Sequence, residues 1–336
     1  MCREVQAVRV LVTVSAYSGP PPLNVVRALT AWHFGVASVV VVVVGVAYLV
    51  GVRCLGARGS TWPAARSYSF VVGGMGSLLL VTSGFVGVYA DTLFWVRAVQ
   101  NVTLLMVSPM LCAMGAPLTL LREFLPGRLR SALGRALRSR TARSLTYPLV
   151  ITPVFVAPLP IVYLSPLYSA TLTHTWVGAL VEVGLLGCGW LYFWTRFRVD
   201  PTPRRDPYLV SLGISVAEVV FDGALGLWVW LGPLLAAGYY EALARPWGPS
   251  LRIDQIVGAG VLWIGGDLAG LPFLAVVLRR LSSEDAHEAE LVDAALDRQE
   301  ELADARSTQQ APDGPDERPR LWWEDHPELA ARFRPR

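Results

Sequence analysis

Lysine is absent from this chain of 336 residues, so all 29 basic side chains are arginine. We attribute the bias to the base composition of the genome and expect no nucleic-acid partner. Cysteine and histidine are scarce, with four residues of each. The cysteines are scattered without a CxxC spacing, which indicates neither a disulfide framework nor a zinc site. Only His33 and His174 lie at apolar stretches, so a metalloenzyme that needs three imidazoles there is excluded.

Charged residues are also rare within seven long apolar stretches, and hydrophobic residues make up 53% of the chain. About 20 apolar residues form a helix long enough to cross the ~30 Å hydrocarbon core of a bilayer. Backbone groups in lipid must be satisfied within the segment, which favours helices. We therefore predict an all-α, polytopic membrane helix bundle. Its seven spans are expected at residues 31–52, 69–90, 94–121, 147–164, 172–194, 208–231 and 255–278.

Proline is concentrated in two of these spans. Pro109 lies near the middle of the third and predicts a kink, because proline lacks the amide donor that a helix interior requires. Four prolines in the fourth span predict a distorted helix.

Arginine is concentrated in alternate loops. Seven arginines lie between the third and fourth spans, and further arginines follow the first, fifth and seventh. The positive-inside rule then places the amino terminus outside and the carboxyl terminus in the cytoplasm. We expect an N-terminal extension over residues 1–29, a membrane domain over 30–281 and an acidic cytoplasmic tail over 282–336.

The tail holds 15 of the 26 acidic residues but only 7 of the 29 basic ones. Ser283 is a candidate helix cap followed by an acidic first turn, and a helix is expected to about Arg306. The proline-rich and aspartate-rich part that follows is predicted to be disordered. Two interpretations of Trp322-Trp323 stay open: a docking motif for a partner, or a segment that lies against the membrane.

A small set of polar residues falls inside the predicted spans, where an ionisable side chain is costly and usually faces the bundle interior. One interpretation is a polar cavity that opens to the outer face. The other is an internal ion pair of Arg97 with Glu182 or Asp222 that fixes helix packing. The set consists of Arg97, Asn101, Glu182, Glu218, Asp222 and Asp267.

Met106, Met110 and Met114 recur every four residues in the third span, with Cys112 nearby. Thioethers are soft ligands that suit Cu(I), and His174 could add an imidazole. A methionine stripe on an apolar helix is also typical of packing. Copper is therefore one possible cofactor, and both interpretations stay open.

Several motifs follow one another in a defined order and spacing: Val99-Gln100-Asn101, Gly115-Ala116-Pro117, Tyr163-Leu164-Ser165-Pro166, Val199-Asp200-Pro201, Trp247-Gly248-Pro249-Ser250, Asp254-Gln255 and Gly266-Asp267. In these motifs the chain resembles the CtaG family of cytochrome c oxidase assembly proteins. The resemblance covers about residues 22–285 and implies a seven-span bacterial inner-membrane protein associated with copper delivery. It implies an oxidase subunit or a copper chaperone as partner, besides the lipid bilayer.

The chain departs from the family where the resemblance implies copper-binding histidines. Arg97 and Asn101 stand where the family has two histidines on the third span, and Asp222 stands where it has one on the sixth. Of the histidines along the fifth span, only His174 is kept. Because a guanidinium cannot bind a metal, we interpret the site as converted to a salt-bridge cluster.

The sequence thus predicts an assembly or accessory factor for a respiratory oxidase that is not an enzyme. Two alternatives are a transporter or channel for copper or another small cation, and a structural membrane scaffold.

Overall fold

The computed structural model describes residues 17–137, 139–197 and 208–268, together with 271, 275, 292–299 and 301–302; the side chains of 148 and 208–218 are excepted. Every regular element in this described part is a helix. The chain divides into two compact units, residues 1–279 and 280–336. The described residues of the second unit are helical. Much of the predicted tail helix, and Trp322 and Trp323, lie outside the described residues.

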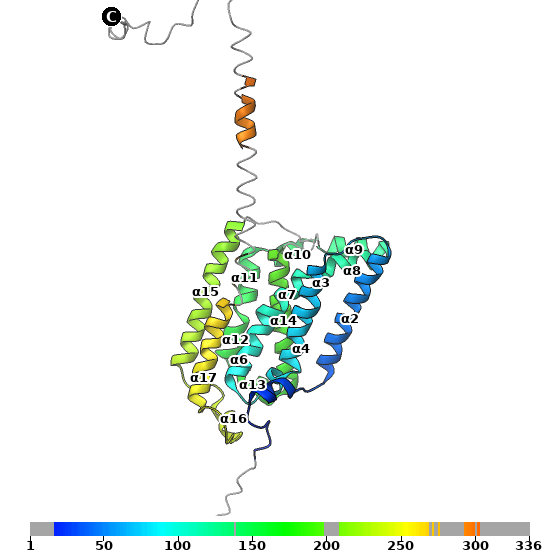
Figure 1. Cartoon of the computed structure of the whole chain (residues 1–336). Coiled ribbons are helices and arrows are strands. Elements are labelled where there is room, and N and C mark those ends of the chain that lie inside the picture. The colour runs from blue at the N-terminus through cyan, green and yellow to red at the C-terminus, as the bar shows by residue number, and fades with distance from the viewer. Residues whose placement is uncertain are drawn as a thin grey trace, which may run out of the picture. The chain divides into compact units, whose positions relative to one another are not determined.

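The first unit is a bundle of helices (Figure 1). Four of its segments are long and apolar enough to cross a membrane: Val36–Ala57, Ala64–Tyr89, Phe94–Met114 and Thr175–Phe197. A fifth candidate joins Leu149–Tyr163 to Leu167–Thr173 through a bend of 70°. The predicted sixth and seventh spans correspond to α15 (Tyr208–Leu231) and to α17 (Leu251–Gly260) with the π-helical turn η3 (Val261–Gly265). Much of the predicted seventh span lies outside the described residues.

The third span ends earlier than predicted. It consists of α6 (Phe94–Val102), the π-helical turn η2 (Thr103–Val107) and α7 (Ser108–Met114). Ala116 has a left-handed backbone with φ of 52°, and α8 (Pro117–Phe124) starts after it. The prediction that the span continues to residue 121 was wrong. The π-helical turn ends two residues before Pro109. Proline has no amide hydrogen, and in a regular α-helix its ring would clash with the carbonyl four residues earlier.

The prolines of the fourth span break it as predicted. Pro148 and Pro158 open two short helices, α11 (Pro148–Val156) and α12 (Pro158–Tyr163), whereas Pro153 lies inside α11; α13 (Leu167–Thr173) follows. A proline fits at the first turn of a helix, where no amide donor is needed. The chain can therefore restart a helix after each break.

The third span is the most buried of the candidate spans, and α2 (Val36–Ala57) is the least. α6 packs against α17, whereas α7 packs against η1 (Tyr68–Met75) and α14 (Thr175–Phe197). Two glycines permit this close packing. A side chain at Gly189 of α14 would collide with the carbonyl of Leu105, and one at Gly74 of η1 would collide with Cys112. Small residues at such crossings let helix backbones approach within lipid.

The remaining helices are short. α1 (Val25–Thr30) precedes α2, and α3 (Ala64–Ser67) precedes η1. η1 continues into α4 (Gly76–Thr82) and α5 (Phe85–Tyr89). α9 (Gly127–Leu137) and α10 (Arg140–Leu145) lie between the third and fourth spans, and α16 (Ala237–Ala242) follows α15.

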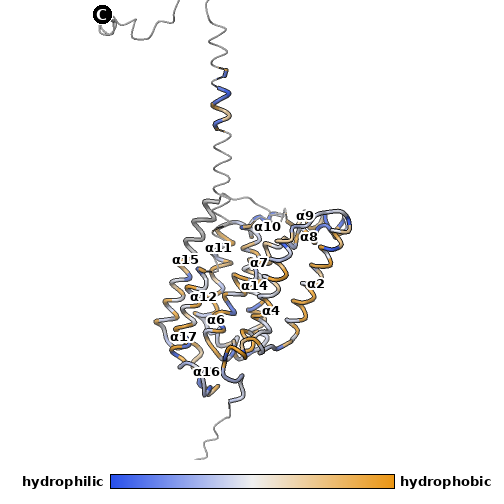
Figure 2. Tube along the Cα trace, viewed as in Figure 1, coloured by the Kyte–Doolittle hydropathy of each residue, from blue (hydrophilic) through white to orange (hydrophobic). Residues whose placement is uncertain are grey.

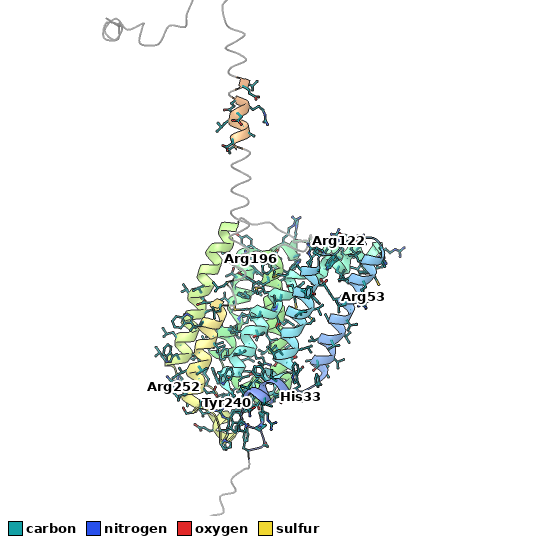
Figure 3. The ribbon with its side chains drawn as sticks, viewed as in Figure 1. His33, Arg53, Arg122, Arg196, Tyr240 and Arg252 are labelled. Carbon is teal, nitrogen blue, oxygen red and sulfur yellow. The ribbon has the colours of Figure 1, made fainter. Side chains whose placement is uncertain are left out.

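The two ends of the bundle differ in charge. Arg53, Arg122 and Arg196 lie toward one end, and His33, Tyr240 and Arg252 toward the other (Figure 3). The tube coloured by hydropathy shows hydrophilic residues around α8 and α9, whereas α2 is hydrophobic along most of its length (Figure 2). The arginine-rich loops after the first and third predicted spans therefore share one end of the molecule.

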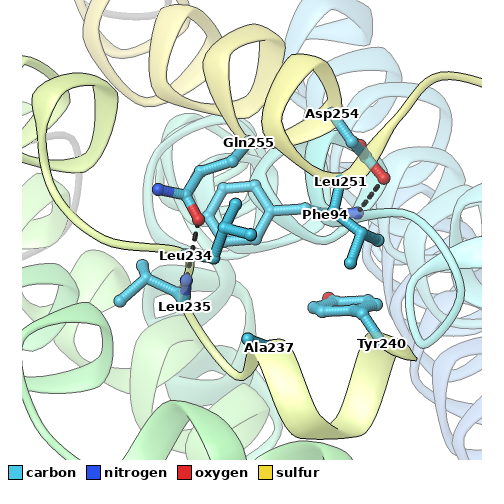
Figure 4. A pocket seen from close by; sticks show the side chains of 8 residues that line it. All are labelled: Phe94, Leu234, Leu235, Ala237, Tyr240, Leu251, Asp254 and Gln255. Carbon is cyan, nitrogen blue, oxygen red and sulfur yellow. Dashed lines mark hydrogen bonds between the residues drawn. The ribbon is translucent and has the colours of Figure 1, made fainter. Parts of the chain in front are cut away.

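Two buried polar residues at the start of α17 hold the opposite end together. Asp254 accepts hydrogen bonds from the first amides of α6, Phe94 N at 3.2 Å and Trp95 N at 3.0 Å. Gln255 accepts from Leu235 N and donates to the carbonyls of Val229 and Pro233. Both face a cavity with room for about one water molecule, which Figure 4 shows. The start of α6, the carboxyl end of α15 and the loop that follows α15 are thus all held by Asp254 and Gln255.

Two arginines, Arg245 and Arg252, also stabilise this end of the bundle. Arg245 lies 3.5 Å from the Asp254 carboxylate, and both side chains are almost fully buried. Arg252 donates to the carbonyls of Gly232 and Trp230, at the carboxyl end of α15. Those carbonyls have no partner within the helix, so the guanidinium caps it and favours its negative dipole end.

We predict that Asp254→Ala lowers the free energy of unfolding by about 3–5 kcal/mol, because it leaves the buried Arg245 without its carboxylate and two helix amides without an acceptor. Thermal unfolding of the purified protein in detergent measures the change. Glu241→Ala removes an exposed carboxylate from α16 and is expected to have little effect. Equal melting temperatures for the two variants would contradict the role of Asp254.

Candidate functional site

Arg97 is a buried cation of the described bundle, 5% exposed, and it has several polar partners. Its Nη1 donates to Asp91 Oδ1 and to Gln100 Oε1, both at 3.2 Å. The same atom lies 3.9 Å from Glu182 Oε1 on α14. Gln100 Nε2 bridges the set, because it donates to Glu182 and to the carbonyl of Val81. We call Asp91, Arg97, Gln100 and Glu182 the Arg97 cluster.

A polar cavity of about 160 Å³ opens beside the Arg97 cluster. Asp91 is 62% exposed at its rim, whereas Glu182 is 28% exposed. Gly178 faces the guanidinium: a Cβ there would lie 3.7 Å from Arg97 Nη2. The cavity is thus lined by a buried cation, Arg97, and by two carboxylates that water can reach, Asp91 and Glu182. Its lining consists of Asp91, Arg97, Thr171, Leu172, Thr175, Gly178, Ala179 and Glu182.

Asn101 does not bond to Arg97, although it lies one turn further along α6. Its Nδ2 donates to Tyr163 Oη at 2.9 Å. The Tyr163 ring stacks on Tyr168, whose hydroxyl lies 2.7 Å from that of Tyr240 on α16. Burial raises the pKa of Tyr240, so its hydroxyl stays protonated and neutral. A layer of buried tyrosines therefore packs next to the Arg97 cluster.

Asp222 lies apart from the Arg97 cluster, and no ion pair joins it to Arg97. Asp222 is on α15, next to Gly266. A Cβ added at Gly266 would lie 2.8 Å from Asp222 Oδ2 and 3.7 Å from Met106 Sδ. Asp267 Oδ1 is buried without a hydrogen-bond partner. Of the two partners expected for Arg97, the structure therefore pairs it with Glu182 and not with Asp222: α15 packs on η3, and Asp222 lies next to Gly266. The Glu218 side chain lies outside the described residues.

The predicted metal-ligand candidates are spread over the bundle. Met106 and Met110 are buried, and Met114 is half-buried. His174 is exposed and lies in the break between α13 and α14, with an extended backbone. His174 was expected inside the fifth span (residues 172–194), but α14 starts at Thr175 and His174 precedes it. No group of three or more His, Cys, Asp or Glu that could hold a metal occurs among the described residues.

Gln100, Asp91 and Tyr163 belong to the site but were missed as site residues. Asp91 was assigned to a loop, and Gln100 and Tyr163 were noted only as parts of motifs. One signal was available for Gln100: an uncharged amide next to Arg97 and Asn101 in a span carries polar atoms that must find partners in lipid.

The fold and the site together define a helical membrane protein with a charged cluster in its interior. The sequence profile of the cytochrome c oxidase caa3 assembly factor family (Caa3_CtaG) matches residues 46–284. The chain belongs to this family.

Uncharacterized proteins of mycobacteria are similar to the chain. Those of Mycobacterium bovis and Mycobacterium tuberculosis are each 30% identical over 291 residues, which cover 81% of this chain and 43% of the relative. One from Mycobacterium leprae is 27% identical over 279 residues, which cover 80% and 42%. The chain thus spans less than half the length of these relatives. No solved structure is significantly similar to it.

We predict that Arg97→Leu lowers the free energy of unfolding by about 2 kcal/mol. Removing one partner of a fully buried pair costs more, but Asp91 and Glu182 are partly exposed. Thermal unfolding in detergent measures the loss. Arg27→Leu is the matched control, because Arg27 is exposed on α1. An Arg97→Leu protein as stable as the control would contradict a structural role for the cluster.

Proposed function

We propose that this chain is an integral membrane assembly factor for a cytochrome c oxidase and acts by binding a partner, not by catalysis. The partner is an oxidase subunit or a copper chaperone. We place the chain in a bacterial cell membrane with seven spans, its amino terminus outside and its arginine-rich end in the cytoplasm. Family membership, the apolar spans and the arginine-rich end support the proposal.

One observation carries the mechanistic part: Arg97 is buried and hydrogen-bonded in the bundle interior. Its position is one where the family resemblance implies imidazole ligands. A guanidinium stays protonated and has no lone pair to offer a metal. Its fixed positive charge also repels a copper ion. We therefore propose that the Arg97 cluster is a structural element in place of a copper site.

The cavity beside Arg97 offers a place for a partner to engage. Asp91 and Glu182 present carboxylate oxygens to it, and Thr171 and Thr175 line the same space. A polar side chain of an oxidase subunit could bond to these groups in place of water. The cluster would then fix the shape of the docking surface, because Arg97 ties α6 to α14 through Glu182.

The transporter alternative needs a polar path, and the candidate side chains that the structure describes lie in two separate places. Glu182 contacts Arg97 and Gln100, whereas Asp222 lies against Gly266. The geometry therefore favours the assembly role.

We predict that deleting the gene lowers the amount of assembled oxidase and that added copper does not restore it. The physical reason is that the proposed role is to hold a partner, which copper cannot replace. Oxidase activity and haem spectra of membranes, measured with and without added copper, test this. A plasmid copy of the natural chain should restore activity, and Met110→Leu should restore it equally. Full rescue by copper alone would contradict the proposal and indicate copper delivery.

A further inference from the structure

The helices between the third and fourth spans carry a charge that the described structure does not neutralise. α8, α9 and α10 lie together at the arginine-rich end of the bundle (Figure 1), and we call them the basic platform. Arg130 pairs with Glu123 at 3.8 Å. Five other exposed arginines make no ion pair with any described residue: Arg122 on α8, and Arg128, Arg135, Arg140 and Arg143 on α9 and α10.

Apolar side chains are exposed among these arginines. Leu129 of α9 is 54% exposed and Leu145 of α10 is 47% exposed. On α9, Leu133 and Leu137 are half-buried one helical turn apart, whereas Arg128 and Arg135 are exposed. A short helix with an arginine-rich face and exposed leucines is typical of a segment that lies in the plane of the membrane interface.

The neighbouring helix places this platform at the level of lipid headgroups. α2 exposes a row of valines, among them Val39 at 62% and Val43 at 59%, as a helix in contact with lipid does. Leu120 of α8 packs close to Gly51, near the carboxyl end of α2. The Arg58 guanidinium, which follows α2, lies 5.2 Å from the ring of Phe124. The basic platform is thus attached where the lipid-facing surface of α2 ends.

We propose that the basic platform binds the headgroups of anionic phospholipids in the leaflet at the arginine-rich end. Arginine matches a phosphate with two parallel N–H donors, and the exposed leucines can enter the acyl boundary beside it. The positive charge of the basic platform would also attract an acidic protein, but the exposed leucines and the position at the end of α2 favour lipid as the partner. This inference does not rest on the proposed function in oxidase assembly.

The test compares lipid binding by the full chain in a neutral detergent. Native mass spectrometry with rising phosphatidylglycerol or phosphatidylcholine of the same acyl chains gives two dissociation constants. We expect the natural chain to prefer phosphatidylglycerol. Replacing Arg128, Arg135, Arg140 and Arg143 with Gln should reduce the preference at least about ten-fold, since each basic side chain contributes roughly five-fold.

A variant with Lys at the same four positions is the matched control, and it should keep the preference within about three-fold because the charge is retained. Glycerol phosphate at the same concentration should not compete. The preference of the natural chain should also fall as NaCl rises from about 0.1 to about 1 M, because the Debye length shrinks from ~10 to ~3 Å; this measurement decides the matter if the Gln variant does not fold. An unchanged preference in a folded Gln variant would overturn the proposal. So would loss in the Lys variant, competition by glycerol phosphate, or no preference in the natural chain.

Discussion

The guanidinium of Arg97 is the constraint around which the described bundle is arranged. A charge this deeply buried must be matched by hydrogen bonds and opposite charge, or the helix that carries it will not stay in the interior. Asp91, Gln100 and Glu182 supply that match from the loop before α6, from α6 itself and from α14. The requirement therefore fixes how the third and fifth predicted spans face one another.

Polar side chains also hold the end of the bundle opposite the arginine-rich loops. Hydrophobic burial gives little preference for one helix arrangement over another when lipid is as apolar as the helix surfaces. Asp254 and Gln255 favour one helix arrangement over others, because each bonds to backbone groups that have no partner within their own helix. In this protein, hydrogen bonds determine the arrangement, and close contacts at Gly74 and Gly189 let the backbones approach.

The sequence predicted the helical class, most of the apolar segments and the proline breaks, because these depend on local length, hydropathy and amide chemistry. It also gave Glu182 as one of two possible partners of Arg97. It did not predict the end of the third span at Met114: Gly115 and Pro117 are residues typical of a helix end, but the apolar run continues to Leu121. Asp222 was the other possible partner of Arg97, but the rotation of α15 depends on its packing against η3, which the sequence pattern does not reveal. Asp254 and Gln255 appeared only as a motif, because their partners are distant in sequence.

A double-mutant cycle on Arg97 and Glu182 tests the central claim most directly. Arg97→Leu, Glu182→Leu and the double variant are each unfolded in detergent, and the coupling energy is the departure from additivity. If the two charges depend on one another in the interior, the coupling energy is at least about 1 kcal/mol and the double variant is more stable than the sum of the single losses predicts. Additive losses, within about 0.5 kcal/mol, would show that Arg97 and Glu182 act independently and would contradict the account.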